Sequence, residues 1–217
     1  MNRVKVKICG ITREEDLSLT IRLRPDALGF IIGVPNSPRN ITIRTAEKFF
    51  EFIPSNIKSI IVTVSLNVDY LKTICERLRP HALQIHGESS LDSSILRKKL
   101  PSICLIRAVN GISDRVIETA KTASESFDAI LIDSKINGKL GGTGIIHDWN
   151  MSRIVRNAIL PKPLILAGGL TPENVGDAIS NVKPYAVDVS SGVESSPGIK
   201  DPQKILSFIR NVRESLL

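Results

Sequence analysis

Several patterns are scarce or missing in this sequence of 217 residues, and each absence excludes a class of protein. The three cysteines, Cys9, Cys75 and Cys104, are an odd number without a CxxC spacing, which argues against a disulfide framework and against a zinc site. The longest apolar run, residues 27–34, is far shorter than the ~18 residues of a membrane span, and residues 1–10 lack the apolar centre of a secretory signal. We therefore expect a cytoplasmic protein with no metal site and no membrane partner.

Aromatic residues are also scarce, at 4% of the chain, although the formal net charge is +7. A basic protein can bind nucleic acid through the phosphates, but single-strand binders place aromatic side chains among their cations for base stacking. Here the Lys and Arg residues are spread over many segments with acidic residues between them, and aromatics do not interleave with them. This distribution favours solvated helix faces or steering of a small anionic substrate, and we expect no nucleic-acid partner.

Short β-branched runs alternate with longer amphipathic stretches along the whole chain, which is the pattern of repeated βα units with a parallel sheet. Eight such pairs predict a (β/α)₈ TIM barrel, formed as one α/β domain over residues 1–217. No GxGxxG motif follows the first run, which disfavours the alternative of an open doubly wound sheet. The expected strands are Val4–Cys9, Ala27–Ile32, Ile57–Val64, Ala82–Ile85, Ile103–Ala108, Ala129–Asp133, Pro163–Ala167 and Ala186–Val189.

Three of the expected helices have a capping pattern at their start. Thr12 with Glu15 forms a capping box, and the Thr-Pro-Glu sequence of residues 171–173 supplies a cap, a proline and an acid for a later helix. Asn67 is expected to cap a helix over residues 68–78. These patterns predict that each helix begins at its capping residue.

Catalytic groups of such barrels lie at the carboxyl ends of the strands, and Cys9 ends the first strand beside Gly10. A thiol in that place can be partly exposed, and nearby cations and helix N-termini favour its thiolate. The alternative for Cys9 is the role of a small buried hydrophobic side chain. That second role is what we expect of Cys75 and Cys104.

Four other residues, at strand ends or in the loops after strands, are candidates for the site. Asp133 ends an apolar strand and would bring a carboxyl group to the barrel mouth, where it could serve as an acid or only as a loop cap. The loop after it contains Gly142 in a glycine-rich run and is long enough for a substrate lid. Arg39 could clamp a carboxylate with its planar fork or be an exposed arginine, and His86 could line the pocket or be structural.

Glycine and serine clusters follow the last two expected strands. Gly168 and Gly169 come after the seventh strand, and Ser190, Ser191 and Gly192 come after the eighth. Backbone N–H groups made accessible by glycine, together with serine hydroxyls, can hold a phosphate without a metal. Because the loops after strands 7 and 8 are neighbours in a barrel, the two clusters predict a phosphate site.

Six motifs follow one another in a fixed order over nearly the whole chain. They are residues 6–12 (VKICGIT), 84–87 (QIHG), 131–135 (LIDSK), 141–144 (GGTG), 167–175 (AGGLTPENV) and 186–194 (AVDVSSGVE). With these motifs the sequence resembles the phosphoribosylanthranilate isomerases, tryptophan-pathway enzymes of the ribulose-phosphate-binding barrels. Residues 62–65, Val-Thr-Val-Ser, depart from the aromatic-containing run that is usual in this family, which concerns the shape of the pocket there rather than the chemistry.

The resemblance implies an Amadori rearrangement of N-(5-phosphoribosyl)anthranilate to 1-(2-carboxyphenylamino)-1-deoxyribulose 5-phosphate, with no cofactor. It implies that Asp133 is the general acid, Cys9 the general base, and Arg39 the partner of the anthranilate carboxylate. The glycine and serine loops would bind the phosphate, and His86 and Gly142 would also contact this phosphosugar-anthranilate substrate. The enzyme would be a monomer or a homodimer.

Two other functions remain as alternatives. A histidine-pathway aminoaldose isomerase performs similar chemistry, but it is expected to have an aspartate at the end of strand 1, where this chain has Cys9. Turnover of each substrate distinguishes the two enzymes. A non-catalytic barrel that binds a phosphate ligand or nucleic acid is the other alternative, and salt-sensitive retention on DNA without isomerase activity would support it.

Overall fold

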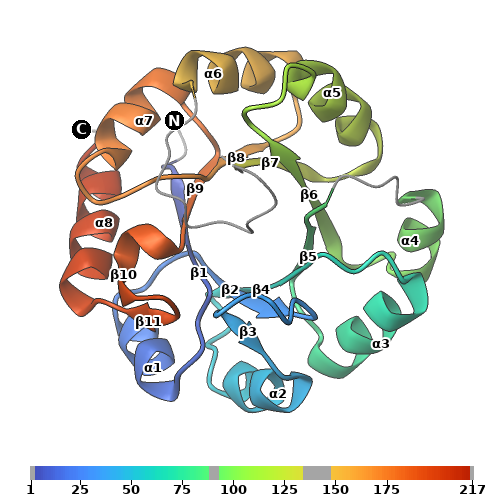
Figure 1. The fold of residues 1–217 in the computed structure, drawn as a ribbon, viewed down its shortest axis with the longest axis vertical. Coiled ribbons are helices and arrows are strands. Elements are labelled where there is room, and N and C mark those ends of the chain that lie inside the picture. Colours follow the sequence, from blue (N-terminus) through green and yellow to red (C-terminus); the bar gives the residue numbers. More distant parts are fainter. Residues whose placement is uncertain (1–2, 88–92, 134–147, 216–217) are drawn as a thin grey trace.

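The computed structural model describes residues 3–87, 93–133 and 148–215. Within these ranges eight parallel strands close into a barrel, because β1 pairs with β9 on one side and with β2 on the other (Figure 1). The single-domain (β/α)₈ prediction is confirmed. The barrel strands are β1 (Lys5–Cys9), β2 (Ala27–Ile32), β4 (Lys58–Thr63), β5 (Ala82–Ile85), β6 (Cys104–Asn110), β7 (Ala129–Asp133), β8 (Leu164–Leu166) and β9 (Ala186–Val189).

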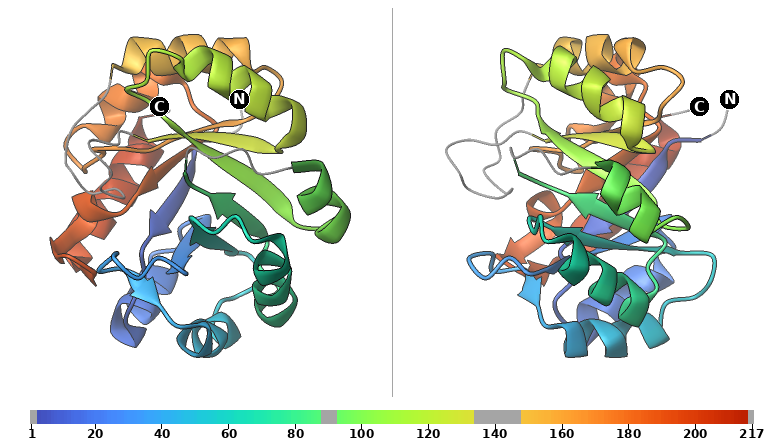
Figure 2. Two further views of the ribbon diagram at one scale, coloured as in Figure 1. Left: turned by 45° about the vertical axis from the view of Figure 1, so that its right-hand side comes forward. Right: turned by 90° about the vertical axis from the view of Figure 1, so that its right-hand side faces the viewer.

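A ring of α-helices surrounds the barrel, and Figure 2 shows them along its sides. In the described ranges they are α1 (Glu14–Arg22), α2 (Ile43–Glu51), α3 (Val68–Leu78), α4 (Ser93–Lys99), α5 (Val116–Ser126), α6 (Trp149–Ala158), α7 (Val175–Val182) and α8 (Pro202–Glu214). Over the same part of the chain, no helix combines the length and the apolar character needed to cross a membrane.

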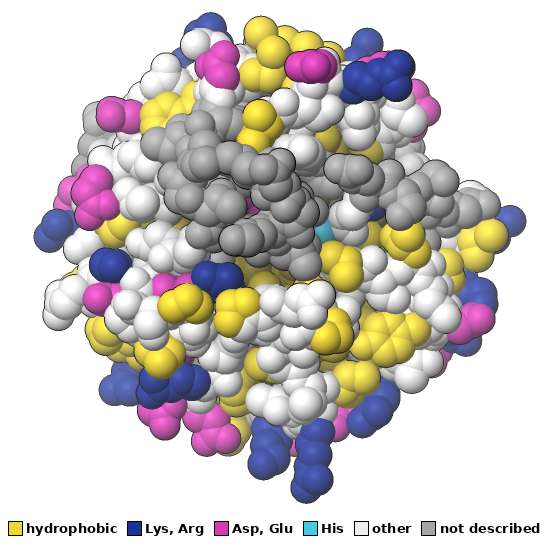
Figure 3. Space-filling view, viewed as in Figure 1, with side chains coloured by type: hydrophobic (Ala, Val, Ile, Leu, Met, Phe, Trp, Pro, Cys, Tyr) yellow, Lys and Arg dark blue, Asp and Glu magenta, His cyan; other side chains and the backbone are white. Residues whose placement is uncertain are grey.

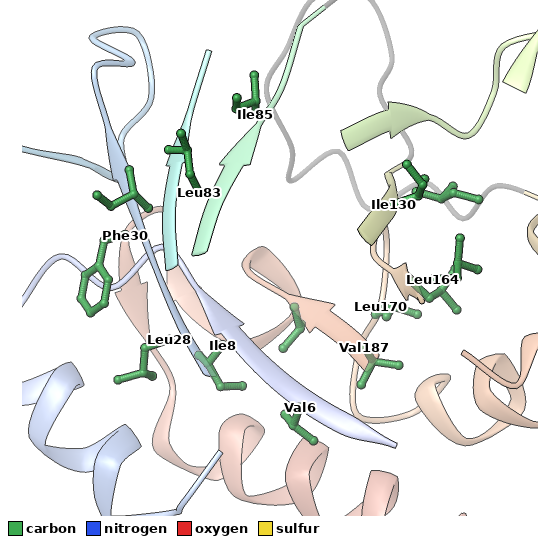
Figure 4. Close-up of a cluster of buried hydrophobic side chains, with 14 of the residues drawn as sticks. Val6, Ile8, Leu28, Phe30, Leu83, Ile85, Ile130, Leu164, Leu170 and Val187 are labelled. Carbon is green, nitrogen blue, oxygen red and sulfur yellow. The ribbon is translucent and has the colours of Figure 1, made fainter. Parts of the chain in front are cut away.

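Two apolar layers result from the alternation of side chains along each strand. The outer layer lies between the strands and the helices and contains large side chains such as Ile8, Leu28 and Phe30 (Figure 4). The inner layer fills the barrel and is rich in small residues, since six of its twelve buried members are alanines, among them Ala27 and Ala108. Small inner side chains leave room for polar groups inside the barrel.

The observed helix starts agree with the predicted one at Asn67 and differ from the predicted ones at Thr12 and Thr171. Asn67 caps α3, since its side chain accepts hydrogen bonds from the N–H groups of Asp69 and Tyr70. Thr12 does not cap α1, because its hydroxyl donates to the carbonyl of Gly198 and the helix begins two residues later. The prediction of a capping box there is wrong.

The helix expected from Thr171 also begins later than predicted. Asn174 holds residues 172–174 in a turn: its side chain accepts from Thr171 N–H and donates to the carbonyl of Gly169. Consequently α7 begins only at Val175. Residues 172–174 therefore belong to the loop after β8 and do not form the first turn of α7.

Four short elements were not predicted: β3 (Asn40–Ile41), the 3₁₀ helix η1 (Ser191–Val193), β10 (Glu194–Ser196) and β11 (Ile199–Lys200). β3 extends the sheet beside the carboxyl end of β2, and β10 pairs with β11 in an antiparallel ribbon. Figure 2 shows that β3 and this ribbon lie at the same end of the barrel. They extend the rim around the barrel mouth.

The predictions for the two other cysteines have different outcomes. Cys75 lies on the buried face of α3 with Leu71, Ile74 and Leu78, as expected. Cys104 is exposed, not buried, because it is the first residue of β6, at the amino end of the barrel. The prediction of core packing for Cys104 is therefore wrong.

Candidate active site

A cavity opens at the carboxyl ends of the barrel strands, and residues from six of the expected site positions or clusters line it. The lining includes Cys9, Arg39, His86, Asp133, Gly168, Gly169, Ser190, Ser191 and Gly192. Gly142 and the loop expected to form a lid lie outside the described residues. The structure thus places all the other predicted site residues around one cavity, although their roles remain predictions.

Cys9 is the last residue of β1, and its side chain points into the barrel, where it is 6% exposed. Burial raises the pKa of the thiol above its ordinary value. The positive charge of Lys7 acts in the opposite direction, Asp188 adds to the rise, and Lys200 opposes it more weakly. The thiol therefore lies in an apolar place that charged groups surround.

Asp133 ends β7 and is only partly buried. Its backbone is held by the neighbouring strand, since it pairs with Asn110 of β6 and its carbonyl accepts a hydrogen bond from Gly111 N–H. The regular strand therefore fixes the position at which its carboxyl group enters the cavity. A carboxyl group there can exchange a proton with a ligand bound above the barrel.

Arg39 is buried and already engaged with a carboxylate of the protein. Its Nε and Nη2 donate to the two oxygens of Glu194 at 2.8 and 2.6 Å. Lys200 Nζ donates to Glu194 Oε1 at 2.9 Å and to the carbonyl of Ser190 at 3.1 Å. Burial alone would raise the pKa of Glu194, but the bonds from Arg39 and Lys200 hold that pKa below its usual value.

The bidentate pair leaves Nη1 of Arg39 and one Nη2 hydrogen for another acceptor, because no further bond from this side chain is made within the described chain. The fork can therefore still meet a second carboxylate along its outer edge. Gly10, at φ +76°, leaves space for this arrangement, since a Cβ there would lie 2.7 Å from Arg39 Cδ.

The two glycine and serine clusters meet at the cavity. Gly168 and Gly169 both have positive φ, 82° and 65°, which favours glycine at these positions. Gly192 packs so closely on the loop after β8 that a Cβ would lie 1.9 Å from the carbonyl oxygen of Leu170. The buried Ser190 hydroxyl finds no hydrogen-bond partner among the described residues. These groups leave donors and space at the cavity, and the binding of a phosphate there stays a prediction.

His86 is buried at the cavity wall and its Nε2 lies 2.7 Å from Gln84 Nε2. Gln84 in turn accepts from Lys7 Nζ, and Lys7 pairs with Asp188. Sequence reasoning missed Lys7, Gln84 and Asp188. A signal was present for all three. Lys7, Gln84 and Asp188 each lie in a strand two residues before an expected site residue, namely Cys9, His86 and Ser190, and residues two apart in a strand face the same side.

Charges on the face around the barrel mouth are mixed. Figure 3 shows basic and acidic side chains interspersed near the rim of this face, with no single basic surface. Within the described ranges, no three His, Cys, Asp or Glu side chains group together as a set of metal ligands.

Three comparisons with known proteins agree with one another. The family model for N-(5'-phosphoribosyl)anthranilate (PRA) isomerase matches residues 6–211. N-(5'-phosphoribosyl)anthranilate isomerase of Methanothrix thermoacetophila is 40% identical over 210 residues, covering 96% of this chain and 98% of the relative. The enzyme of that name from Pseudomonas fluorescens is 40% identical over 213 residues, covering 98% of this chain and all of the relative.

Solved structures are similar over the same span. Phosphoribosyl anthranilate isomerase from Thermotoga maritima has a TM-score of 0.87 and 36% identity, with 97% of this chain and 99% of that one covered. Another solved phosphoribosyl anthranilate isomerase holds reduced 1-(o-carboxyphenylamino)-1-deoxyribulose 5-phosphate, with a TM-score of 0.83 and 34% identity over 97% of this chain and 99% of that one. The family match over most of the chain, the full-length relatives and the common barrel show that this chain belongs to the N-(5'-phosphoribosyl)anthranilate isomerase family.

Proposed function

We propose that this chain converts N-(5-phosphoribosyl)anthranilate into 1-(2-carboxyphenylamino)-1-deoxyribulose 5-phosphate, with Asp133 as the general acid and Cys9 as the general base. The observation that carries the proposal is the presence of Cys9 and Asp133 on the wall of one cavity, with the two glycine and serine loops on the same wall. A sugar phosphate anchored at those loops would extend over both groups.

The chemistry needs one proton donor and one proton acceptor. Asp133 protonates the ribose ring oxygen, so that the ring opens and the nitrogen forms an iminium with C1. Cys9 then removes the proton from C2, and the electron pair of that C–H bond moves to the iminium to give an enolamine. The enolamine tautomerises to the ketone. No cofactor is needed, because the iminium of the substrate accepts the electron pair.

The two ends of the substrate match different groups in the lining of the cavity. The outer edge of the Arg39 guanidinium suits the anthranilate carboxylate, for which parallel hydrogen bonds give both affinity and orientation. The glycine backbone at 168–169 and the buried Ser190 hydroxyl suit the phosphate. His86 and Gly142 are further substrate contacts in this proposal. Fixing both ends positions C2 for proton transfer.

The state of assembly in this proposal is a monomer or a homodimer. A solved phosphoribosylanthranilate isomerase from Thermotoga maritima is described as dimeric, with monomers generated from it. Sedimentation of the purified chain at several concentrations decides between the two states.

The test of the proposal is a fluorescence assay that follows the loss of N-(5-phosphoribosyl)anthranilate. The wild-type chain should turn this compound over, whereas Cys9→Ala and Asp133→Asn should each lower kcat at least about a hundredfold while substrate still binds. Cys104→Ser is the matched control, since that thiol is exposed at the opposite end of the barrel. Near wild-type turnover by Cys9→Ala would show that another group is the base.

A second arm of the assay offers the histidine-pathway aminoaldose. We expect turnover of this compound to be far slower, because Cys9 stands where that reaction is expected to use an aspartate. Preferential turnover of the aminoaldose would contradict the proposed substrate. The competing enzyme activity is thus tested with the same protein.

A further inference from the structure

Lys7 is a buried cation inside the barrel, beneath the cavity. Its side chain is 3% exposed, and its Nζ donates to Asp188 Oδ2 at 2.6 Å and to Gln84 Oε1 at 2.9 Å. Taking an ammonium out of water costs several kcal/mol unless it is well paired, so a buried lysine in the middle of a barrel calls for an explanation. Asp188 supplies the countercharge, but the acid–base steps of the proposed function leave both residues without a task.

The two acceptors hold the ammonium from two different strands. Lys7 pairs with Asp188 across the β1–β9 register, so that the two side chains lie at the same level of the barrel. Gln84 approaches from β5, on the other side of the barrel interior. Gln84 is in turn fixed by its contact with His86. The ammonium is therefore held in one place rather than free to move through the cavity.

The lack of a side chain at Gly29 leaves a space that the ends of the Lys7 and Cys9 side chains share. Gly29 pairs with Cys9 in the β1–β2 register, and it carries no side chain to occupy the barrel interior. A Cβ built on Gly29 would lie 2.7 Å from Cys9 Sγ and 3.0 Å from Lys7 Cε. The thiol and the end of the lysine side chain thus share the space that a side chain at position 29 would fill.

Without a nearby cation, a thiolate at position 9 would be unfavourable. The inner layer around Cys9 is made of alanine, isoleucine, valine and leucine side chains, which do not solvate an anion. Yet only the thiolate can accept the C2 proton. Among the charged groups near Cys9, Lys7 has the largest favourable effect on the thiolate, ahead of Lys200.

We infer that Lys7 is a positioning residue whose ammonium, fixed by Asp188 and Gln84, stabilises Cys9 as the thiolate that removes the C2 proton. The inference rests on the proposed role of Cys9 as the base. Lys7 does not touch the substrate in this account: it acts through the sulfur atom. Among the residues that the structure describes, the charged or titratable groups that face Cys9 or its cavity are Lys7 on β1, Asp188 on β9, Lys200 on β11, Arg39 after β2, His86 after β5 and Asp133 on β7.

The experiment is a pH titration of the ultraviolet thiolate absorbance of Cys9. The contribution of Cys9 is obtained as the difference between each protein and the same protein with Cys9→Ala, which removes the signals of Cys75 and Cys104. In Lys7→Met, which keeps an unbranched apolar chain and loses the charge, the midpoint should rise by at least about one pH unit, a tenfold loss of thiolate below the midpoint. The rising limb of kcat/KM against pH should move in the same direction.

A second variant guards against loss of folding. Lys7→Met leaves the carboxylate of Asp188 buried without a cation, and breaking a buried pair from one side costs ~3–5 kcal/mol. Lys7→Met with Asp188→Asn removes both charges. The double variant should have a higher midpoint than Asp188→Asn alone, because these two proteins differ only in the cation at position 7, and that cation favours the thiolate.

The outcomes separate three explanations. A raised midpoint with a parallel shift of the kcat/KM profile supports the inference. In folded proteins, an unchanged midpoint in Lys7→Met, or equal midpoints in the double variant and Asp188→Asn, overturns it even if kcat falls, because a purely structural role for Lys7 predicts lower activity without a change in thiol titration. The thiol titration does not depend on turnover. An active Cys9→Ala enzyme would therefore contradict the proposed base without altering what this titration says of Lys7 and Cys9.

Discussion

Cys9 and Cys75 are both buried thiols, but they lie in the two different apolar layers of the barrel. Cys75, in the outer layer, lies on an apolar helix face, and burial raises its pKa to about 12. Cys9, in the inner layer, is also desolvated, yet Lys7 and Lys200 oppose the rise of its pKa. Burial alone makes a thiol inert, and fixed cations are what can restore its reactivity.

The same contrast holds for the layers as a whole. The outer layer joins strands to helices with large apolar side chains and stabilises the fold by burial. The inner layer contains a buried ion pair, Lys7 with Asp188. Apolar residues of similar size in their place would often leave the protein equally stable or more stable. We therefore expect substitutions in the outer layer to change the stability of the fold, and substitutions near the barrel mouth to change the catalytic chemistry.

The largest stability effect is expected in the outer layer. Phe49→Ala on α2 removes a ring that is 2% exposed and packs on Phe30, and it should lower the free energy of unfolding by ~3–5 kcal/mol. Phe52→Ala, just after the same helix, is the matched control: that ring is 67% exposed, so the change should stay within ~0.5 kcal/mol. Denaturant titration measures both. A large drop in kcat of folded Phe49→Ala would break the comparison between layers.

A smaller effect, on binding, is expected at the rim of the cavity. Arg39→Ala should raise KM about tenfold to a hundredfold with a smaller change in kcat, because a hydrogen bond to a charged group contributes ~1.5–3 kcal/mol before as well as during the reaction. Glu194→Gln should raise KM less, since the fork stays but loses the anion that orients it. Steady-state kinetics of the two variants measures both KM values and shows which substitution raises KM more. An unchanged KM in Arg39→Ala would count against its contact with the carboxylate.

The smallest effect, counted per pH unit, is the pH dependence of stability through Cys75. In the folded protein its pKa is about 12, whereas the ordinary value is 9.0. The unfolded chain therefore releases this proton first, so the contribution is fully present below pH 9 and falls by about 1.4 kcal/mol per pH unit as the pH rises toward 12. Cys75→Ala should lose that part of the slope in unfolding titrations at alkaline pH. An identical slope in both proteins would show that the thiol is not desolvated.

Much of the barrel could be predicted because its strands are short apolar runs separated by helical patterns. Ala27–Ile32, Ala82–Ile85, Ala129–Asp133 and Ala186–Val189 have the predicted bounds. The helix starts at Thr12 and Thr171 could not be predicted correctly. The Thr12 hydroxyl bonds the distant carbonyl of Gly198, and the side chain of Asn174 holds residues 172–174 in a turn. The prediction of core packing for Cys104 was wrong, because the alternation of side chains along a strand indicates which face a residue takes but not how near it lies to the end of the barrel.

The sequence by itself determined the fold class, the family and the positions of Cys9, Asp133 and the two glycine and serine loops proposed to bind phosphate, because strand ends and glycine turns are local features. Only the tertiary structure decided that Glu194 holds Arg39, and that Asp188 and Gln84 hold Lys7 beside Cys9. Those partners are 155, 181 and 77 residues apart in the chain. No local pattern can pair residues across such distances, because the closure of the barrel is what brings them together.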